Sequence, residues 1–349
     1  MSDILARVAE MLQRHSNILI ITHYDPDGDA AGSLSGLGHL CVRLGKQVRL
    51  YCHSAMPAGL DWLNWPVSLV RDFSELRGWC PDLLVLVDCA TAERGGPESS
   101  DFFAGKRPAG WENTASLCID HHSDNPHFAQ LNWVDAEAGA TAQLIGQLAG
   151  WFAQPLSGDL GEAIYLGMVN DTGNFTYANT SSTILRMAAD ILDLGLRPEE
   201  FTRKGENNWS SNRMQLWGEL MRNISIRAEG RVVSVRIELS MLKKYRCDPS
   251  DLEGFVSFLR RLKGVDATLL VREKPAKLSS GANSLKGCGC KISLRSLGGE
   301  NSVDVQAIAA HFGGGGHKSA AGASTELTPF ETEKAVLELL IPAVEALHR

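Results

Sequence analysis

The amino-acid sequence predicts an α/β fold, with an N-terminal doubly wound, mostly parallel sheet and a smaller C-terminal α/β domain. The first observation is the alternation of short apolar runs and helix-like segments between residues 17 and 178, which is typical of βαβ units. The second is a new set of alternating strand patterns that begins near Ile224. The third is the length of 349 residues, which exceeds one typical domain.

The N-terminal part has the more regular pattern. Because each short apolar run is followed by a helical segment, the runs are expected to be parallel strands with helices on both faces of the sheet. In such sheets, ligands bind at the carboxyl ends of the strands. Strands are expected at residues 18–21, 47–52, 83–87, 116–119 and 163–169, and helices at about 30–44, 141–152 and 183–196.

The C-terminal part follows a polar connector in which Trp209 and Trp217 share one helical face, a spacing that suggests packing between domains. The Lys-, Ser- and Gly-rich loop at 273–290 has no role that the sequence indicates. The predicted boundaries are 1–196 for the N-terminal domain, 197–223 for the connector and 224–349 for the C-terminal domain. Strands are expected at 224–228, 232–237, 267–272 and 291–296, and helices at 252–262, 303–311 and 331–348.

Composition excludes several classes of protein. Hydrophobic residues make up 44% and charged residues 21% of the chain, values that indicate a globular protein rather than a disordered one. No apolar run approaches the roughly 20 residues of a membrane span. The amphipathic start carries Asp3 and Glu10 where a signal peptide has an apolar core. Several of the eight cysteines lie in apolar stretches, as reduced thiols do, so we expect a cytoplasmic protein with no membrane segment.

The net charge of −7 argues against long duplex nucleic acid as a partner, because such binding uses many Lys and Arg contacts with phosphate. The charge is also uneven. Residues 255–297 contain nine Lys or Arg and two acids, a balance of +7, which leaves −14 for the remainder. A solvated basic face explains this pattern, and so does a module that holds an anion beside a module that holds metal ions.

The segment His23-Tyr24-Asp25-Pro26-Asp27-Gly28-Asp29 follows the first predicted strand. Three carboxylates and one imidazole within seven residues are unfavourable together unless a cation lies among them. The alternative is a polar turn in which Asp29 caps the next helix.

Acidic or histidine residues follow three further predicted strands. Asp88 follows the run 83–87, Asp120-His121-His122 follows 116–119, and Asp171 follows 163–169. One such Asp could cap a helix. Four clusters at strand ends of one sheet are instead expected to converge on one site.

Charge arithmetic indicates the occupant of that site. Four aspartates bring −4, and two divalent cations bring +4, the usual arrangement for hydrolysis of phosphate esters. Carboxylate and imidazole ligands without thiolate favour Mn²⁺, with Mg²⁺ or Co²⁺ as alternatives. The four aspartates are Asp27, Asp29, Asp88 and Asp171.

A second candidate site is the run Gly313-Gly314-Gly315-Gly316-His317-Lys318. It is either a flexible turn or a loop whose backbone N–H groups approach a phosphate or nucleobase, with a helix expected to start at residues 319–323. It is not a Walker A loop, because His317 precedes Lys318.

In combination, these motifs resemble those of the DHH phosphoesterase superfamily, whose ordered motifs match His23-x-x-x-Asp27-x-Asp29, Asp88, Asp120-His121-His122 and Asp171-Thr172-Gly173. Residues 293–296, 303–305 and 313–322 resemble the associated DHHA1 domain of the subfamily that includes oligoribonucleases and cyclic-dinucleotide phosphodiesterases. The resemblance spans residues 18–323.

The resemblance implies a role for each matching residue. Asp88 would bridge two metal ions, His122 would contact the scissile phosphate, and Asp120 would orient a ligand. The other implied metal ligands are His23 and Asp27 for one ion, and Asp29, His121 and Asp171 for the other. The implied substrate-binding residues are His122, Arg295, Gly314, Gly315, Gly316, His317 and Lys318.

The implied activity is hydrolysis of short oligoribonucleotides of two to five nucleotides to 5′-mononucleotides, and of 3′-phosphoadenosine 5′-phosphate (pAp) to AMP. The expected partner is short single-stranded RNA or a small nucleotide held between the two domains, and a homodimer is compatible with the sequence. Three alternatives stay open: a cyclic di-AMP or pApA phosphodiesterase, a pyrophosphatase or exopolyphosphatase, and a catalytically inactive nucleotide sensor.

Overall fold

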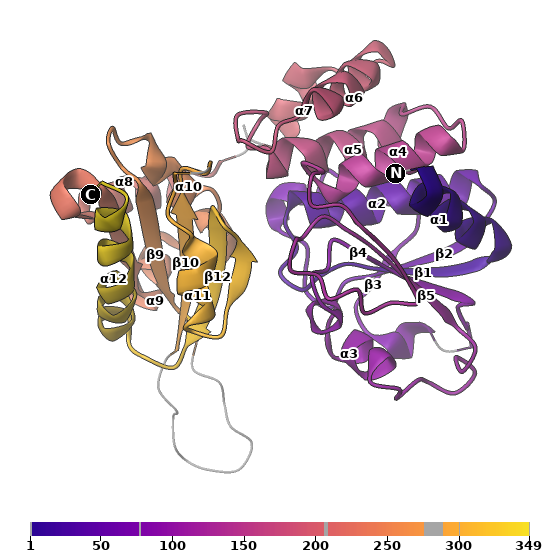
Figure 1. Ribbon diagram of the computed structural model, residues 1–349, viewed down its shortest axis with the longest axis horizontal. Helices are drawn as coiled ribbons and strands as arrows, with labels where there is room; N and C mark the ends of the chain where they lie inside the picture. Colours follow the sequence, from indigo (N-terminus) through magenta and orange to yellow (C-terminus); the bar gives the residue numbers. More distant parts are fainter. Residues whose placement is uncertain (1, 77, 206–208, 276–288, 300, 349) are drawn as a thin grey trace. The chain divides into compact units, whose positions relative to one another are not determined.

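The computed structural model describes residues 2–76, 78–205, 209–275, 289–299 and 301–348 (Figure 1). The chain divides into two units, Met1–Asn208 and Trp209–Arg349, and each contains one six-stranded sheet. Within the described ranges, no helix has both the length and the apolar character that crossing a membrane requires. Residues 276–288, which form most of the predicted Lys-, Ser- and Gly-rich loop, lie outside the described residues.

The sheet of the first unit is wholly parallel, as the apolar runs predict. Its strands are β1 (Asn17–Ile21), β2 (Gln47–Tyr51), β3 (Leu69–Val70), β4 (Leu83–Val87), β5 (Ala115–Asp120) and β6 (Leu131–Val134). The strand order is β3-β2-β1-β4-β5-β6, and every neighbouring pair is parallel. The direction of winding therefore reverses between β1 and β4, which is where such sheets bind ligands.

Helices cover both faces of this sheet (Figure 1). The helices on the sheet are α1 (Ser2–Arg14), α2 (Gly28–Arg43), α3 (Pro97–Phe103), α4 (Thr141–Trp151) and α5 (Gly158–Asp171). Two further helices, α6 (Ser182–Asp193) and α7 (Pro198–Gly205), lie beyond α4 and α5, away from the sheet. Ile18 and Ile20 of β1 face the core beneath α2, α4 and α5, whereas Leu19 and Ile21 face the core beneath α3. Because both faces of the strand are buried, its sequence is one continuous apolar run.

The strand expected at 163–169 is wrong, because these residues lie inside α5. Their apolar character comes from packing of α5 against α2 and α4, and a short apolar run does not distinguish a buried strand from a buried helix. The sequence patterns also missed β3, β6 and α3, which are short.

The second unit contains a mixed sheet between two helical layers. Its strands are β7 (Ser225–Arg227), β8 (Val232–Ile237), β9 (Ala267–Glu273), β10 (Cys290–Ser296), β11 (Gly315–His317) and β12 (Ala320–Thr325). The order is β11-β12-β10-β9-β8-β7, in which only β8 and β9 are parallel neighbours. The helices are α8 (Ser211–Arg222), α9 (Leu239–Tyr245), α10 (Phe255–Phe258), α11 (Val305–Ala310) and α12 (Pro329–Ala346).

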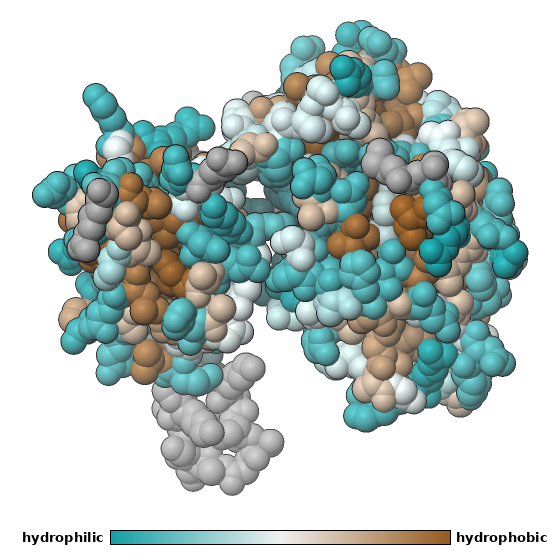
Figure 2. Space-filling view, viewed as in Figure 1, coloured by the Kyte–Doolittle hydropathy of each residue, from teal (hydrophilic) through white to brown (hydrophobic). Residues whose placement is uncertain are grey.

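Two apolar cores hold this sheet. One packs α11 and α12 against one face, and the other packs α8, α9 and α10 against the opposite face. Trp217 of α8 lies in the second core, where its ring contacts Phe255 at 4.9 Å and Trp209 at 4.5 Å between centroids. Figure 2 shows apolar side chains on the surface of this unit among predominantly polar ones.

Candidate metal centre

Three clusters of predicted site residues lie at neighbouring strand ends. His23 comes two residues after β1, Asp88 follows β4 directly, and Asp120 ends β5. The order β1-β4-β5 makes their carboxyl ends adjacent. Asp88 has a φ of 57°, a left-handed conformation that costs free energy for a residue with a side chain and that recurs at functional sites.

Asp27 and Asp29 enter the site from the start of α2. Asp27 caps this helix, because its Oδ1 accepts hydrogen bonds of 3.1 Å from the backbone N–H groups of Asp29 and Ala30. Asp29 is fully buried, and its carboxylate accepts from the N–H groups of Thr141 at 2.6 Å and Ala142 at 2.9 Å. The alternative in which Asp29 caps its own helix is therefore wrong, because Asp29 instead binds the N-terminus of α4.

Asp171 reaches the site from the C-terminal end of α5 rather than from a strand. Close packing of α5 brings it there: a Cβ on Gly167 would lie 2.4 Å from Asp29 Oδ1 and 2.4 Å from Ala142 Cβ, so only glycine fits. A carboxylate at a helix C-terminus opposes the helix dipole, and a nearby cation offsets that cost.

Asp88 lies between two histidines. Its Oδ2 is 3.5 Å from Nε2 of His23, and its Oδ1 is 3.7 Å from Nε2 of His121. His23 Nε2 also lies 4.0 Å from Asp27 Oδ1, and the Nδ1 of His23 is 2.9 Å from the Tyr24 carbonyl oxygen. Asp88 therefore turns one oxygen toward each histidine.

His121 lies close to a second group of carboxylates. Its Nε2 lies 3.0 Å from Asp171 Oδ2 and 3.8 Å from Asp29 Oδ2, while its Nδ1 is 3.2 Å from the Ala138 carbonyl oxygen. A carbonyl oxygen can only accept, so both His23 and His121 carry a proton on Nδ1 and direct Nε2 toward carboxylates.

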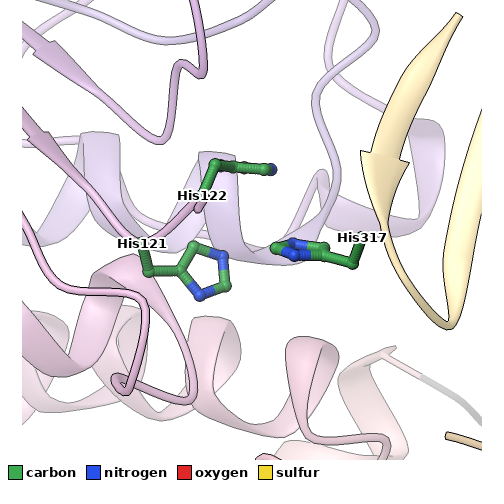
Figure 3. Close-up of side chains that lie close together, drawn as sticks. All are labelled: His121, His122 and His317. Atoms are coloured by element: carbon green, nitrogen blue, oxygen red, sulfur yellow. The ribbon is translucent and has the colours of Figure 1, made fainter. Parts of the chain in front are cut away.

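His122 stands beside His121 at the end of β5, as Figure 3 shows. The two rings are 5.0 Å apart at an angle of 70°. Nδ1 of His122 lies 2.8 Å from Asp120 Oδ1 and 3.8 Å from Asp88 Oδ1. Asp120 is fully buried, and its Oδ2 accepts a 2.7 Å hydrogen bond from Asn125 Nδ2, so the carboxylate that orients His122 is itself held in place.

The buried charges of the centre shift the pKa values of its carboxylates in opposite directions. Burial, together with the charges of Asp88 and Asp171, raises the pKa of Asp29 well above its usual value. Burial alone would raise the pKa of Asp88 too, but the hydrogen bond with His23 and the positive charges of the histidines lower it far below its usual value. The carboxylates and imidazoles thus compensate one another with protons, which divalent cations can replace.

The donor set fits divalent metal ions. His23, Asp27 and Asp88 each offer one ligand atom, and these atoms all lie within 4.8 Å of one another. The same holds for Asp29, His121 and Asp171 and for Asp88, Asp120 and His122. A Nδ1–H group that donates to a backbone carbonyl leaves Nε2 free to bind a metal ion, which is the usual outer-sphere support of a histidine ligand.

Two buried residues of the centre were missed by sequence reasoning. Thr141 donates from Oγ1 to Asp88 Oδ1 over 2.9 Å, and Asn125 donates to Asp120 as described above. Thr141 begins α4, and Asn125 lies shortly after the Asp-His-His motif. The only sequence signal for Asn125 is its position shortly after the Asp-His-His motif. The only sequence signal for Thr141 is its position at the start of a predicted helix.

In the second unit, the predicted substrate-binding residues lie on a hairpin and its neighbour. The expected helix start at 319–323 is wrong, because β12 occupies 320–325 and pairs with β11 and β10. Cross-strand pairing has overridden the helical propensity of the alanines. Gly313 lies in the turn after α11 with a φ of 69°, and the segment Gly314, Gly315, Gly316, His317 and Lys318 then contains all of β11 and the start of the turn to β12.

Arg295 and His317 share one row of this sheet. Arg295 pairs with Ala320, and Ala320 pairs with His317. Residues paired across adjacent strands point to the same face, so both side chains lie on one face, two strands or about 10 Å apart. The side chain of Lys318, in the two-residue turn, donates to the Gly299 carbonyl oxygen at 3.3 Å.

The fold and the site together define an α/β protein with a carboxylate and imidazole centre at the switch point of a parallel sheet, followed by a mixed-sheet unit. Residues 17–168 match the family model described as DHH family, N-terminal domain, and residues 230–346 match the DHHA1 domain. The chain therefore contains a DHH domain followed by a DHHA1 domain. The resemblance seen in the motifs is confirmed.

Relatives align with this chain over most of its length. The bifunctional oligoribonuclease and PAP phosphatase NrnA of Thermus thermophilus is 29% identical over 318 residues, which cover 91% of this chain and 87% of that protein. The protein of the same name from Bacillus subtilis is 26% identical over 317 residues, which cover 89% of this chain and 90% of that protein.

Solved structures share the fold. An exopolyphosphatase-related protein from Bacteroides fragilis is 25% identical, with a TM-score of 0.83 and coverage of 99% of this chain and 98% of that one. RecJ from Thermus thermophilus, in complex with Mn²⁺, has a TM-score of 0.54 at 14% identity and covers 97% of this chain and 55% of that one.

Proposed function

We propose that this protein is a metal-dependent phosphoesterase that hydrolyses short oligoribonucleotides to 5′-mononucleotides and pAp to AMP. The observation that carries the proposal is the position of Asp88, whose two oxygens face His23 and His121. The relatives named oligoribonuclease and PAP phosphatase, which align with 91% and 89% of the chain, support this substrate class.

Two divalent cations are proposed at the centre, and Mn²⁺ is the proposed metal because the donor set is carboxylate and imidazole without thiolate. Mg²⁺ and Co²⁺ are the alternatives. When bound, the cations would lower the pKa of a water ligand and so supply hydroxide near neutral pH. His23 and Asp27 would hold one ion, Asp29, His121 and Asp171 the other, and Asp88 would contact both.

The protein's own groups position the phosphate and stabilise its charge. His122, held by Asp120, is proposed to donate a hydrogen bond to a phosphoryl oxygen of the scissile phosphate. Burial alone lowers the pKa of His122, but the hydrogen bond with Asp120 and the charge of Asp88 outweigh burial and raise it, which favours the protonated donor. In the overall reaction the oxygen of a water molecule bonds to phosphorus, the bond from phosphorus to the sugar 3′ oxygen breaks, and that oxygen leaves as a hydroxyl group with a proton that came from the water.

The second unit is proposed to contribute to nucleotide binding through Arg295 and the segment Gly314–Lys318. Their shared row on β10, β12 and β11 supports this assignment. The proposed partner is short single-stranded RNA or a small nucleotide. That the protein binds neither long duplex nucleic acid nor a membrane stays a prediction from the sequence. The cytoplasm stays the predicted compartment, and each of the seven cysteines in the described segments is a free thiol.

One chromatographic assay tests the substrate class. The protein is freed of metal, reloaded with Mn²⁺, and given di-, tri- and pentanucleotide RNA, pAp, cyclic di-AMP and pyrophosphate in parallel. Release of 5′-mononucleotides from RNA and of AMP from pAp is expected. Preferential turnover of cyclic di-AMP or of pyrophosphate would replace the proposal with one of those activities, and binding without turnover would indicate a nucleotide sensor.

A variant tests the centre itself. Asp88→Asn should abolish activity, because it removes the charge that faces both histidines. Asp61→Asn, which changes an exposed carboxylate of the same unit, is the matched control and should retain activity. Full hydrolytic activity of Asp88→Asn would refute the proposed centre.

A further inference from the structure

Arg94 lies near the candidate centre, and the sequence motifs give it no role. It belongs to the short 3₁₀ helix Ala92–Gly95 that follows β4. Its carbonyl oxygen accepts a 2.8 Å hydrogen bond from the backbone N–H of Tyr24, the residue directly after His23. The segment after β4 thus crosses the end of β1, and beyond it Glu98 accepts a 2.6 Å hydrogen bond from the hydroxyl of Tyr51, at the end of β2.

The guanidinium of Arg94 lies over an aromatic ring. Its Cζ lies 5.1 Å from the ring centroid of Tyr24, which is 39% exposed. Stacking occupies the face of a guanidinium but leaves the N–H groups at its edge directed outward in the plane. Across the described ranges, no carboxylate lies within ion-pair distance of Arg94. Its side chain is therefore oriented and able to receive an anion.

The charge of Arg94 lies beside the centre, because both its backbone and its guanidinium contact Tyr24, the residue directly after His23. A fixed positive charge next to a site for divalent cations weakens metal binding by repulsion. This arrangement is favourable overall when the site binds a ligand that is itself strongly anionic. A substrate with two phosphate groups meets that requirement, with one phosphate at the metal ions and another at the arginine.

We infer that Arg94, stacked on Tyr24, binds a phosphate group of the substrate that is not hydrolysed. This inference rests on the proposed function. His122 follows β5, whereas Tyr24 follows β1, two strands or about 10 Å away in the order β1-β4-β5. The phosphate at Arg94 is therefore a different group from the scissile phosphate at His122.

The chemistry of the proposed substrates identifies this second group. When the sugar 3′ oxygen is the leaving group, pAp and a 5′-phosphorylated oligonucleotide both present a 5′-phosphate on the nucleoside that leaves. Arg94 recognises this shared 5′-phosphate, so one binding position serves both substrates. An oligonucleotide that lacks the 5′-phosphate gains nothing from Arg94.

The test compares Arg94→Gln and Arg94→Lys with the wild type on two dinucleotides that differ by one phosphate, pApA and ApA. Arg94→Gln should raise KM for pApA and pAp about tenfold or more, because a charge-assisted hydrogen bond is lost. KM for ApA should hardly change, and Arg94→Lys should be intermediate. Mn²⁺ affinity, measured by calorimetry, should not fall. An equal rise in KM for ApA and pApA, or none for pApA, would overturn the inference.

A matched control is available in Arg107, whose guanidinium also stacks on an aromatic ring, that of Phe102 at 4.4 Å. Its N–H groups donate to the carbonyl oxygens of Glu112 and Thr114, so Arg107→Gln should leave KM unchanged. Calorimetry of pAp with the Ca²⁺-loaded protein separates the two proposals. Weaker pAp binding by Arg94→Gln than by the wild type supports the inference, even if the wild type hydrolyses none of the substrates. Equal pAp binding by the two proteins, or no pAp binding by the wild type, overturns it.

Discussion

The hydroxyl of Thr141 donates a 2.9 Å hydrogen bond to Oδ1 of Asp88, the oxygen that faces His121. The backbone N–H of the same threonine donates to Asp29 over 2.6 Å. One residue at the start of α4 therefore fixes two carboxylates that are assigned to the metal ions. This gives the helix a role in the centre that its sequence does not indicate.

Thr141→Val should weaken Mn²⁺ binding about tenfold or more, because the variant keeps the shape of the side chain but removes the donor to Asp88. Thr141→Ser restores the hydroxyl and should restore the affinity. Calorimetric titration of the metal-free protein measures the effect. Thr114→Val is the control: it removes a buried 2.7 Å hydrogen bond to the Pro81 carbonyl, away from the centre, and should not change Mn²⁺ affinity. Unchanged affinity in Thr141→Val would contradict the assignment.

Gly167→Ala should destabilise the first unit by about 2 kcal/mol, because the new methyl group overlaps Asp29 and Ala142 in a closely packed core. It should also weaken Mn²⁺ binding, since Asp29 must shift. Gly150→Ala is the control, because nothing lies within 4 Å of a Cβ at that position of α4, and it should be neutral or stabilising by up to about 1 kcal/mol. Chemical denaturation and metal titration of both variants provide the measurements.

The central strands β1, β4 and β5 and the polar residues at their ends could be predicted, because these strands are buried on both faces and the polar residues come at or just after their ends. Asp171 could not be placed correctly, because α5 is as apolar at 163–169 as a central strand would be. The hairpin of β11 and β12 was missed for the opposite reason. Its alanines and glycines carry little strand preference, and only pairing with β10 makes it a strand.

The supporting residues were beyond prediction for a different reason. Asn125 contacts Asp120, and Thr141 contacts Asp88, across 5 and 53 positions of the sequence. Neither pair has a spacing that marks it. Arg94 likewise reaches Tyr24 only because the segment after β4 crosses the end of β1.

Buried thiols should resist alkylation. Burial raises the pKa of Cys41 to about 12 and that of Cys52 to about 11, so at pH 8 only about one Cys52 thiol in a thousand is the reactive thiolate. Cys80 is exposed. Brief treatment with iodoacetamide followed by peptide mass spectrometry should modify Cys80 first, and Cys41 and Cys52 only after unfolding. Equal rates for Cys41 and Cys80 in the folded protein would show that the first unit opens readily.

The pair of Asp120 and His122 should set the alkaline limit of activity. Burial lowers the pKa of His122, but the hydrogen bond with Asp120 and the charge of Asp88 raise it above its usual value. The protonated donor therefore persists to higher pH than in an ordinary histidine and is lost as pH rises through this raised pKa. Asp120→Asn removes the charge that holds the proton, so the alkaline limb of kcat should move to lower pH.

Removal of the His122 imidazole should lower kcat more than a change in its pKa does. His122→Ala should lower kcat about 100-fold or more at pH values where the wild-type His122 is protonated, as removal of one donor to a developing oxyanion does, while Mn²⁺ affinity stays within a few-fold. His127→Asn, in the exposed part of the same loop, should behave as the wild type. If His122→Ala loses its metal affinity instead, His122 is a metal ligand rather than a phosphate donor. The grouping of Asp88, Asp120 and His122 within 4.8 Å makes that the direct alternative.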